Sequence, residues 1–251
     1  MLNLTDITLT YPDGGASVTA INHANLTVKP GEFAAVTGPS GSGKSSLLTV
    51  AATLTSPDSG SVEIAGIETT SLNQKEKTAV RRDHVGIVFQ SPNLIPSLTV
   101  AEQLEIVARL GAGTFKGISK KESQERIESA LEAVGMLDRA HHRPGALSGG
   151  QRQRVNIARA IIHQPEVLLV DEPTSALDQE RSQAIIELLV ETTHKRDLAT
   201  VVVTHAQEQL AEFDSAYRMV DGVLSADGDA GKANVGTGSH AHTHAKAPEY
   251  V

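Results

Sequence analysis

The feature that most constrains the fold is the glycine-rich run GPSGSGKS at residues 38–45. It follows an apolar run, residues 32–37, that has the pattern of a buried strand, and it precedes apolar residues at helical spacing from Leu47 to Leu54. Glycines allow backbone N–H groups to face phosphate oxygens, and the start of a helix adds the positive end of its dipole. A strand, such a loop and a helix in succession predict an α/β fold that binds phosphate.

Two side chains at the end of this loop have the expected chemistry. Lys44 is expected to reach the β- and γ-phosphates of a nucleotide, and Ser45 is expected to hold Mg²⁺. The other positions of the loop and the residue after it are expected to bind the same nucleotide: Gly38, Pro39, Ser40, Gly41, Ser42, Gly43 and Ser46. The alternative is a glycine- and serine-rich turn without a ligand, which the flanking strand and helix disfavour.

A second candidate element is the run VLLVDE at residues 167–172, an apolar strand that ends in two acids. Ligands bind at the carboxyl ends of parallel strands, so both acids are expected to face the glycine-rich loop. Asp171 is placed to support Mg²⁺, directly or through water, and Glu172 is placed to act as general base on an attacking water. A solvated strand end is the alternative, which the nearby phosphate loop makes less favoured.

The run LSGGQ, residues 147–151, precedes apolar residues at helical spacing. Ser148 and Gln151 have the spacing of a capping box, so a helix is expected to begin here. Gly149 and Gly150 in its first turn weaken the helix by about 1 kcal/mol each relative to alanine. This cost suggests that a ligand such as phosphate approaches the bare backbone. An ordinary capped helix remains the alternative.

These elements, together with Tyr11, Gln90, the run SALD at 175–178 and His205, resemble the ATP-binding cassette (ABC) family in content and order over about residues 1–224. The resemblance implies a P-loop NTPase cassette with a RecA-like core, an antiparallel β subdomain and a helical subdomain inserted at about residues 91–163.

Within this family, the run at residues 88–104 is similar to the ATPases of MacB-type permeases, including the lipoprotein-releasing and cell-division relatives. The run LVDEPTSALD departs from the wording common in that group, and Ser46 stands where threonine is usual. The sequence also resembles actinobacterial haem-efflux ATPases, although nothing in it indicates a haem site.

The resemblance implies roles for single residues. Two copies of the chain would enclose two ATP molecules head to tail, with residues 148–151 of one copy completing the site of the other. Tyr11 would stack on adenine, Gln90 would reach Mg²⁺ and the attacking water, and His205 would contact the γ-phosphate. Taken alone, these three are better explained as a strand-end aromatic, a surface amide and a helix cap; their positions relative to the loop reverse that preference.

The expected function is that of an ATP hydrolase, with ATP and Mg²⁺, that works as a homodimer and powers integral membrane permease subunits similar to MacB. The absence of cysteine and of any apolar run longer than four residues is typical of a cytosolic domain. The resemblance implies that this domain lies peripherally at the cytoplasmic face of the cell membrane. The net charge of −8 and the aromatic content of 3% disfavour nucleic acid as a partner.

Three alternatives share the same ATPase. Chromosome and DNA-repair ATPases need long coiled-coil arms between the phosphate loop and LSGGQ, and the interval from Ser45 to Leu147 is too short for them. Translation-associated cassette proteins have two cassettes in one chain. A cell-division regulator, whose membrane partner moves no substrate, stays open.

Residues 225–251 contain few large apolar side chains and are expected to form a disordered tail. Three histidines in it, His240, His242 and His244, could bind a transition metal, but a solvated tail is favoured.

Two surface features complete the expectations. Residues 91–96 are expected to expose Leu94 and Ile95 in a loop that contacts a membrane partner. A helix is expected after His205, and a closing hairpin is expected to turn at Asp221-Gly222.

Overall fold

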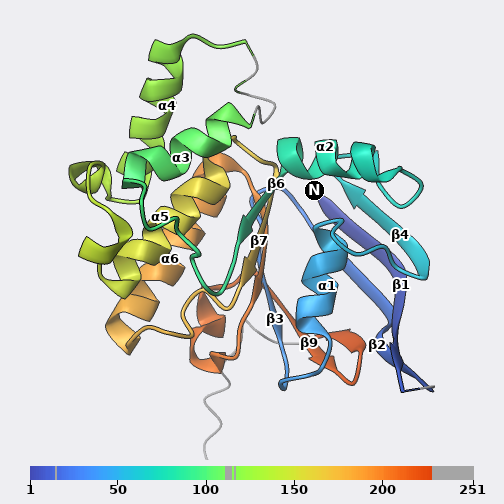
Figure 1. Cartoon of the computed structure of the whole chain (residues 1–251). Helices are drawn as coiled ribbons and strands as arrows, with labels where there is room; N and C mark the ends of the chain where they lie inside the picture. Colours follow the sequence, from blue (N-terminus) through green and yellow to red (C-terminus); the bar gives the residue numbers. More distant parts are fainter. Residues whose placement is uncertain (15, 111–114, 116, 228–251) are drawn as a thin grey trace, which may run out of the picture.

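The computed structural model describes residues 1–14, 16–110, 115 and 117–227 (Figure 1). The strands are β1 (Leu2–Asp13), β2 (Ala16–Val28), β3 (Phe33–Thr37), β4 (Ser59–Ile64), β5 (Ile67–Glu68), β6 (Val85–Val88), β7 (Val167–Asp171), β8 (Ala199–Val203), β9 (Ser215–Val220) and β10 (Val223–Ala226). The α-helices are α1 (Lys44–Ala51), α2 (Gln74–His84), α3 (Val100–Arg109), α4 (Lys120–Ala133), α5 (Gly149–Ile161) and α6 (Gln179–Arg196). The 3₁₀ turns are η2 (Leu137–Arg139), η3 (Pro144–Ala146) and η4 (Gln207–Glu212).

In this described part of the chain the strands form two sheets. The larger sheet has the order β10-β9-β3-β8-β7-β6, and every neighbouring pair in it is parallel except β10 with β9. The smaller sheet, β2-β1-β4-β5, is antiparallel. The predicted α/β class with an additional antiparallel sheet is confirmed.

The larger sheet is covered on both faces. Strands β3 and β8 are buried along their whole length, as expected for a parallel sheet between two layers. Phe33 and Ala35 of β3 join the apolar core beneath α5 and α6, whereas Ala34 and Val36 join the core beneath α1 and the antiparallel sheet. Figure 1 shows α1 on one side of the sheet and α5 and α6 on the other.

The helices α3, α4 and α5 lie between β6 and β7 in the chain, where the resemblance placed a helical insertion. Side chains fix where two of them begin. Thr99 and Glu102 form a capping box at α3, and Ser148 and Gln151 form the predicted box at α5. None of the helices in the described ranges is long and apolar enough to cross a membrane.

The segment after His205 differs from the expected α-helix, because it forms the 3₁₀ turn η4. This connection must return from the end of β8 to the start of β9 in only eleven residues, 204–214. A 3₁₀ turn rises about 2.0 Å per residue and an α-helix about 1.5 Å, so the tighter helix spans the distance with fewer residues.

Other boundaries also differ. The helix α1 ends at Ala51, and Leu54 beyond it is exposed, although its spacing had included it in the helix. The helix α2 was not predicted, because most of its residues are polar and too few apolar side chains recur at helical spacing to indicate a buried face. At the other end, β10 continues to Ala226, past the expected limit at residue 224. The predicted tail histidines lie outside the described residues.

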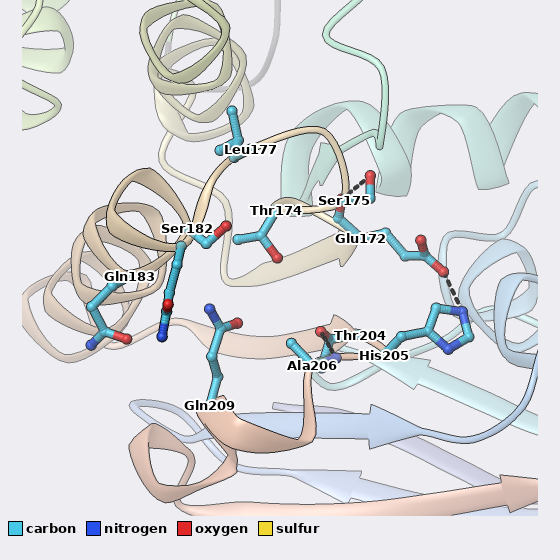
Figure 2. A pocket seen from close by; sticks show the side chains of 11 residues that line it. Glu172, Thr174, Ser175, Leu177, Ser182, Gln183, Thr204, His205, Ala206 and Gln209 are labelled. Carbon is cyan, nitrogen blue, oxygen red and sulfur yellow. Dashed lines mark hydrogen bonds and ion pairs between the residues drawn. The ribbon is translucent and has the colours of Figure 1, made fainter.

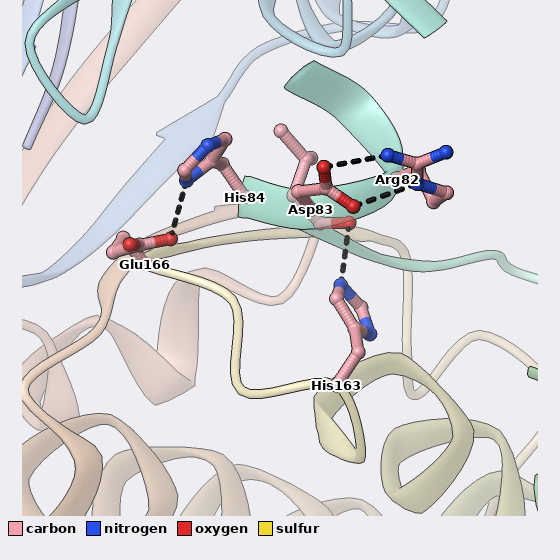
Figure 3. Close-up of polar contacts among 6 residues, drawn as sticks. Arg82, Asp83, His84, His163 and Glu166 are labelled. Carbon is pink, nitrogen blue, oxygen red and sulfur yellow. Dashed lines mark hydrogen bonds and ion pairs between the residues drawn. The ribbon is translucent and has the colours of Figure 1, made fainter. Parts of the chain in front are cut away.

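Several titratable side chains meet where β6 and β7 begin (Figure 3). His84 Nδ1 lies 3.0 Å from Glu166 Oε2, and buried His163 donates from Nε2 to the carbonyl oxygen of Val85 at 3.2 Å. Burial lowers the pKa of His163, as does nearby His84, while the Val85 carbonyl, Asp83 and Glu166 act in the opposite direction. The neutral imidazole is therefore the form that the folded chain favours.

This predicts a loss of stability in mild acid. A histidine with a lowered pKa in the folded state binds protons more readily when unfolded, so its contribution is complete above pH 6.5 and is lost as the pH falls. Urea unfolding between pH 7.5 and 5 should show a smaller pH dependence for His163→Gln than for the wild type. The exposed His141→Gln is the control and should retain the wild-type dependence; equal slopes for all three proteins would contradict the prediction.

Candidate functional site

The glycine-rich loop lies between β3 and α1, where the two sheets meet. Gly38 and Gly43 have φ angles of 141° and 104°, and Gly43 caps the N-terminus of α1. A Cβ at Gly38 would lie 2.0 Å from the carbonyl oxygen of Met219, and one at Gly43 would lie 2.1 Å from that of Ala20. Both positions therefore require glycine for conformation and for space.

The turn between β9 and β10 is hydrogen-bonded to the glycine-rich loop. The N–H of Gly222 donates to Ser42 O at 3.0 Å, and Gly222 O in turn accepts from Asn22 N at 2.8 Å. Asp221-Gly222 is thus the predicted hairpin turn, and it connects the loop to β2. Ser42 Oγ is buried and has no hydrogen-bond partner among the described residues.

Lys44 lies beneath the loop at the start of α1. Its Nζ donates to the carbonyl oxygens of Gly38 and Pro39, each at 2.8 Å, and its side chain is buried. Burial lowers the pKa of Lys44, and the negative charges of Glu172 and Asp171 raise it again. The loop therefore surrounds an ammonium group that faces two acids.

Asp171 is the last residue of β7, and Glu172 follows it directly. Burial raises the pKa of Asp171, the neighbouring Glu172 raises it further, and Lys44 lowers it. Glu172 has a φ of 42°, in the left-handed region, while its N–H still donates to Val203 O at 2.9 Å. This uncommon backbone conformation is maintained by the strand register and lies at the candidate site.

His205 and Glu172 are in direct contact: His205 Nε2 lies 2.7 Å from Glu172 Oε1 (Figure 2). Gln90 reaches the same region through Ser175, the first residue of the SALD run, to which the sequence analysis had given no role of its own. Its Nε2 donates to Ser175 Oγ at 3.2 Å, and Ser175 Oγ donates to the carbonyl oxygen of Glu172 at 3.2 Å.

A cavity of about 600 Å³ opens above the loop, a volume suited to a nucleotide. Nine of the predicted residues line it: Tyr11, Ser40, Gly41, Gly43, Lys44, Ser45, Ser46, Glu172 and His205. Three lining residues were not predicted: Val18, Thr19 and Ala20. Asp221 and Gly222 had been noted only for their turn. Val18 pairs with Tyr11 across the β1–β2 hairpin, and the alternation of the two strands could have indicated this.

Gly38, Pro39 and Ser42 do not line this cavity, because they form the underside of the loop. Ser45 and Asp171 also border a smaller cavity of about 60 Å³, whose lining is otherwise mostly apolar. The hydroxyl of Ser45, which also lines the nucleotide cavity, and the carboxylate of Asp171 are oxygen ligands of the kind that Mg²⁺ prefers.

Glu172 and His205 also border a second cavity, of about 700 Å³, on the side of α6 and η4 (Figure 2). Its wall contains the buried hydroxyls of Thr174, Ser182 and Thr204. Both cavities are lined by Glu172 and His205, so the contact between these two side chains borders both.

Residues 148–151 lie away from the nucleotide cavity of their own chain. Gln151 Oε1 accepts from Ser148 N at 2.9 Å, so the side chain of Gln151 is used in the capping box. A Cβ at Gly149 would lie 3.3 Å from Leu177, and one at Gly150 would lie 3.6 Å from Arg181. Packing within one chain therefore does not require both glycines.

Comparison with known proteins agrees with this geometry. Residues 21–175 match the family model of the ABC transporter. The chain is also 39% identical over 224 residues to the lipoprotein-releasing system ATP-binding protein LolD 1 of Rhodopirellula baltica, which covers 89% of this chain and 96% of that protein. The chain belongs to the ABC transporter family. It is an ATP-binding and ATP-hydrolysing cassette of that family.

Two further ABC relatives are informative. The macrolide export ATP-binding/permease protein MacB of Rhodopseudomonas palustris is 42% identical over 217 residues, 86% of this chain but 32% of MacB. This chain thus spans about a third of the length of that relative. The solved ADP- and Pi-bound dimer of the ATP-binding cassette MJ0796, from Methanocaldococcus jannaschii, has a TM-score of 0.80 and 37% identity, covering 89% of this chain and 96% of that one.

The loop geometry predicts unequal costs for glycine substitutions. Gly43→Ala should destabilise the chain more than Gly66→Ala, because both add a side chain at positive φ but only Gly43 meets a backbone atom. The left-handed conformation alone costs about 1–2 kcal/mol. Urea unfolding of the nucleotide-free chain measures the difference, and equal losses for the two variants would contradict the proposed close approach of Ala20.

Proposed function

We propose that two copies of this chain enclose two ATP molecules head to tail, hydrolyse them, and drive a membrane-embedded permease similar to that of MacB. The observation that carries this proposal is the separation of two nucleotide-binding elements in one chain. The phosphate loop and α1 lie on one side of the larger sheet, whereas the glycines that begin α5 lie on the other. A second copy is the simplest way to bring them together, and the dimeric relative MJ0796 supports it.

In this proposal the loop residues bind the phosphates. Backbone N–H groups of the loop residues that line the cavity, Ser40, Gly41 and Gly43–Ser45, face the phosphate oxygens. Lys44 exchanges its contacts with Gly38 and Pro39 for the β- and γ-phosphates. Tyr11 stacks on the adenine at the far end of the cavity, with Val18 beside it. Ser148, Gly149 and Gly150 of the partner copy close the site over the γ-phosphate.

Mg²⁺ would be held by Ser45, which lines the nucleotide cavity, by Asp171, whose charge acts on Lys44, and by Gln90 after it leaves Ser175. All three supply oxygen ligands, so the donor set fits this ion. When bound, the ion would neutralise charge on the β- and γ-phosphates.

Glu172 acts as general base in this scheme. A water attacks the γ-phosphorus, its proton passes to the Glu172 carboxylate, and the bond to the ADP oxygen breaks, which leaves ADP and phosphate. His205, in contact with Glu172 Oε1, orients the carboxylate and donates to the γ-phosphate. The left-handed backbone at Glu172 directs its side chain toward the cavity.

Replacing the base tests this assignment. Glu172→Gln should keep ATP affinity while slowing hydrolysis by orders of magnitude, so that ATP-bound dimers accumulate. Steady-state hydrolysis and size-exclusion chromatography with ATP measure both effects. Glu180→Gln, an exposed change at the start of α6, is the control and should hydrolyse ATP normally. Hydrolysis near the wild-type rate in Glu172→Gln would exclude Glu172 as the base.

The shared site predicts complementation between two inactive chains. Ser148→Arg should bind ATP as a monomer but abolish turnover, because Ser148 acts on the partner's nucleotide. Lys44→Ala should also be inactive, through loss of phosphate contacts. A mixture of the two variants should regain part of the activity, since a mixed dimer contains one intact site. A mixture as inactive as its components would argue against a site shared between copies.

We further propose that the permease docks beside residues 89–95, which places the chain at the cytoplasmic face of the membrane. Phe89 and Ile87 line two adjoining cavities, one toward α1 and one of about 410 Å³ toward α5. Around them Leu54, Phe89 and Ile95 are 49%, 45% and 43% exposed. Leu94, expected to be exposed, is instead partly buried and packs against the core.

A charge at the exposed Ile95 of this surface should separate hydrolysis from coupling. Ile95→Glu should leave ATP hydrolysis by the isolated chain unchanged while association with its permease falls, because a carboxylate is costly to bury in an apolar contact. Leu137→Glu is the matched control, because Leu137 is 41% exposed on η2, and it should change neither ATP hydrolysis nor association with the permease. Co-purification and transport in vesicles measure the outcome; unimpaired association would exclude this surface. A complex that hydrolyses ATP but transports nothing would favour the cell-division type of regulator.

A further inference from the structure

The segment between β6 and α3 carries Gln90 and has no regular secondary structure, so its backbone depends on side chains for hydrogen bonds. Helix α5 supplies them for the first half. Asn156 Nδ2 donates to Phe89 O at 2.9 Å, and Arg159 donates to Pro92 O at 2.7 Å and to Asn93 O at 3.5 Å.

A different helix supports the second half of the segment. Gln103 of α3 accepts from Ile95 N at 3.1 Å and donates to Ile95 O at 2.7 Å. Its Nε2 also lies 3.4 Å from Leu98 O. Residues 89–93 are therefore attached to α5, and residues 95–98 are attached to α3.

Arg159 is an unusual choice for this position. Its guanidinium is partly buried, and burial lowers its pKa. It bonds to neutral oxygens, the carbonyls of Pro92 and Asn93 and the Oδ1 of Asn156, and no carboxylate of the described residues forms an ion pair with it. Desolvating a cation among neutral partners is costly, and an apolar side chain would avoid that cost.

An apolar side chain could not bind several backbone carbonyls at once. The guanidinium offers five N–H donors in a rigid fork, and here it joins two backbone carbonyls to the amide of Asn156. Asn156 is 0% exposed, so the contact cannot adjust by moving into water. The first half of the segment and α5 are thereby joined as one body.

We propose that Asn156 and Arg159 are positioning residues that transmit the state of one nucleotide site to the other. The inference rests on the proposed function. Gln90 responds to the nucleotide of its own chain, residues 89–93 move with it, and α5 follows through Arg159 and Asn156. Ser148 at the opposite end of α5, about 16 Å away along the helix, then meets the partner's nucleotide at a changed position.

This connection makes binding at the two sites cooperative, because ATP at one site alters the free energy of closing the other. This coupling requires no extended pathway, since the single helix α5 connects the contact with residues 89–93 to the LSGGQ residues.

The test compares two arginines of α5. Arg159→Met removes the contacts with residues 92 and 93, whereas Arg154→Met removes a contact of Arg154 Nη1 with Val134 O, 3.0 Å, within the helical insertion. ATP affinity of the monomer should be unchanged in both. The Hill coefficient for ATP hydrolysis should fall toward 1 in Arg159→Met and stay at the wild-type value in Arg154→Met. Equal Hill coefficients in Arg159→Met and the wild type would overturn the inference, as would equal losses in the two variants.

A structural readout separates positioning from simple loss of stability. The chain has no cysteine, so spin labels can be placed at Gly145→Cys and Glu187→Cys without removing native thiols. In a Glu172→Gln background ATP should shift the distance between them, and adding Arg159→Met should abolish the shift while Arg154→Met keeps it. A shift that persists with Arg159→Met would overturn the inference.

Arg159→Lys provides a variant for the case in which Arg159→Met does not fold. It retains the charge but lacks the planar fork, so it should give an intermediate Hill coefficient; a wild-type value would overturn the inference.

The proposed function fails separately: a wild-type chain that neither hydrolyses ATP nor dimerises with it would contradict that function, independently of Arg159.

Discussion

The close approach of the glycine-rich loop to both sheets is the constraint on which the site depends. Gly38 lies against the backbone of β9 and Gly43 against that of β2, at distances that leave no room for a Cβ. The β9–β10 turn is attached to the loop through Gly222 and Ser42. The loop is therefore fixed by the junction of the parallel and antiparallel sheets, and this junction determines where Lys44 and the start of α1 lie.

Charge follows from that placement. Lys44 is buried among carbonyl oxygens and faces Asp171 and Glu172 across the ends of parallel strands. Burial lowers the pKa of the lysine and raises that of Asp171, and the charge of each group shifts the pKa of the other in the opposite direction. Each group therefore opposes the cost of burying the other. A phosphate ligand would give the ammonium a better partner than the carbonyl oxygens that it contacts in the free chain. The polar residues around Glu172, including His205 and Ser175, are arranged about this charged centre.

The same fold keeps the two ends of α5 in different environments. The backbone of its first turn lies away from the chain's own nucleotide cavity. Its later turns form hydrogen bonds with the irregular segment that carries Gln90. A helix is stiff over this length, so it can convert a small displacement at one end into a displacement at the other. A cassette that works in pairs benefits from such a link. The nucleotide bound by one chain can then affect how that chain contacts the nucleotide of its partner.

Local pattern alone determined much of this protein. The strand, glycine-rich loop and helix at residues 32–51, the buried strand that ends at Asp171, and the capping box of Ser148 and Gln151 each depend on contacts within a few residues. The motif order was also sufficient to indicate the family and the α/β class. These features are encoded locally because periodicity, capping and glycine conformation act over one or two turns of chain.

Tertiary structure decided the rest. Asp221 lines the nucleotide cavity together with Val18, which lies about 200 positions earlier in the chain, and only sheet packing brings these two residues to one cavity. Ser175 became the link between Gln90 and Glu172 only once β6 and β7 were paired. The 3₁₀ form of η4 depends on the short span between β8 and β9, and the burial of Leu94 depends on helices distant in the chain. In each case the deciding contact is non-local, and a sequence pattern reports only the local preferences that such contacts override.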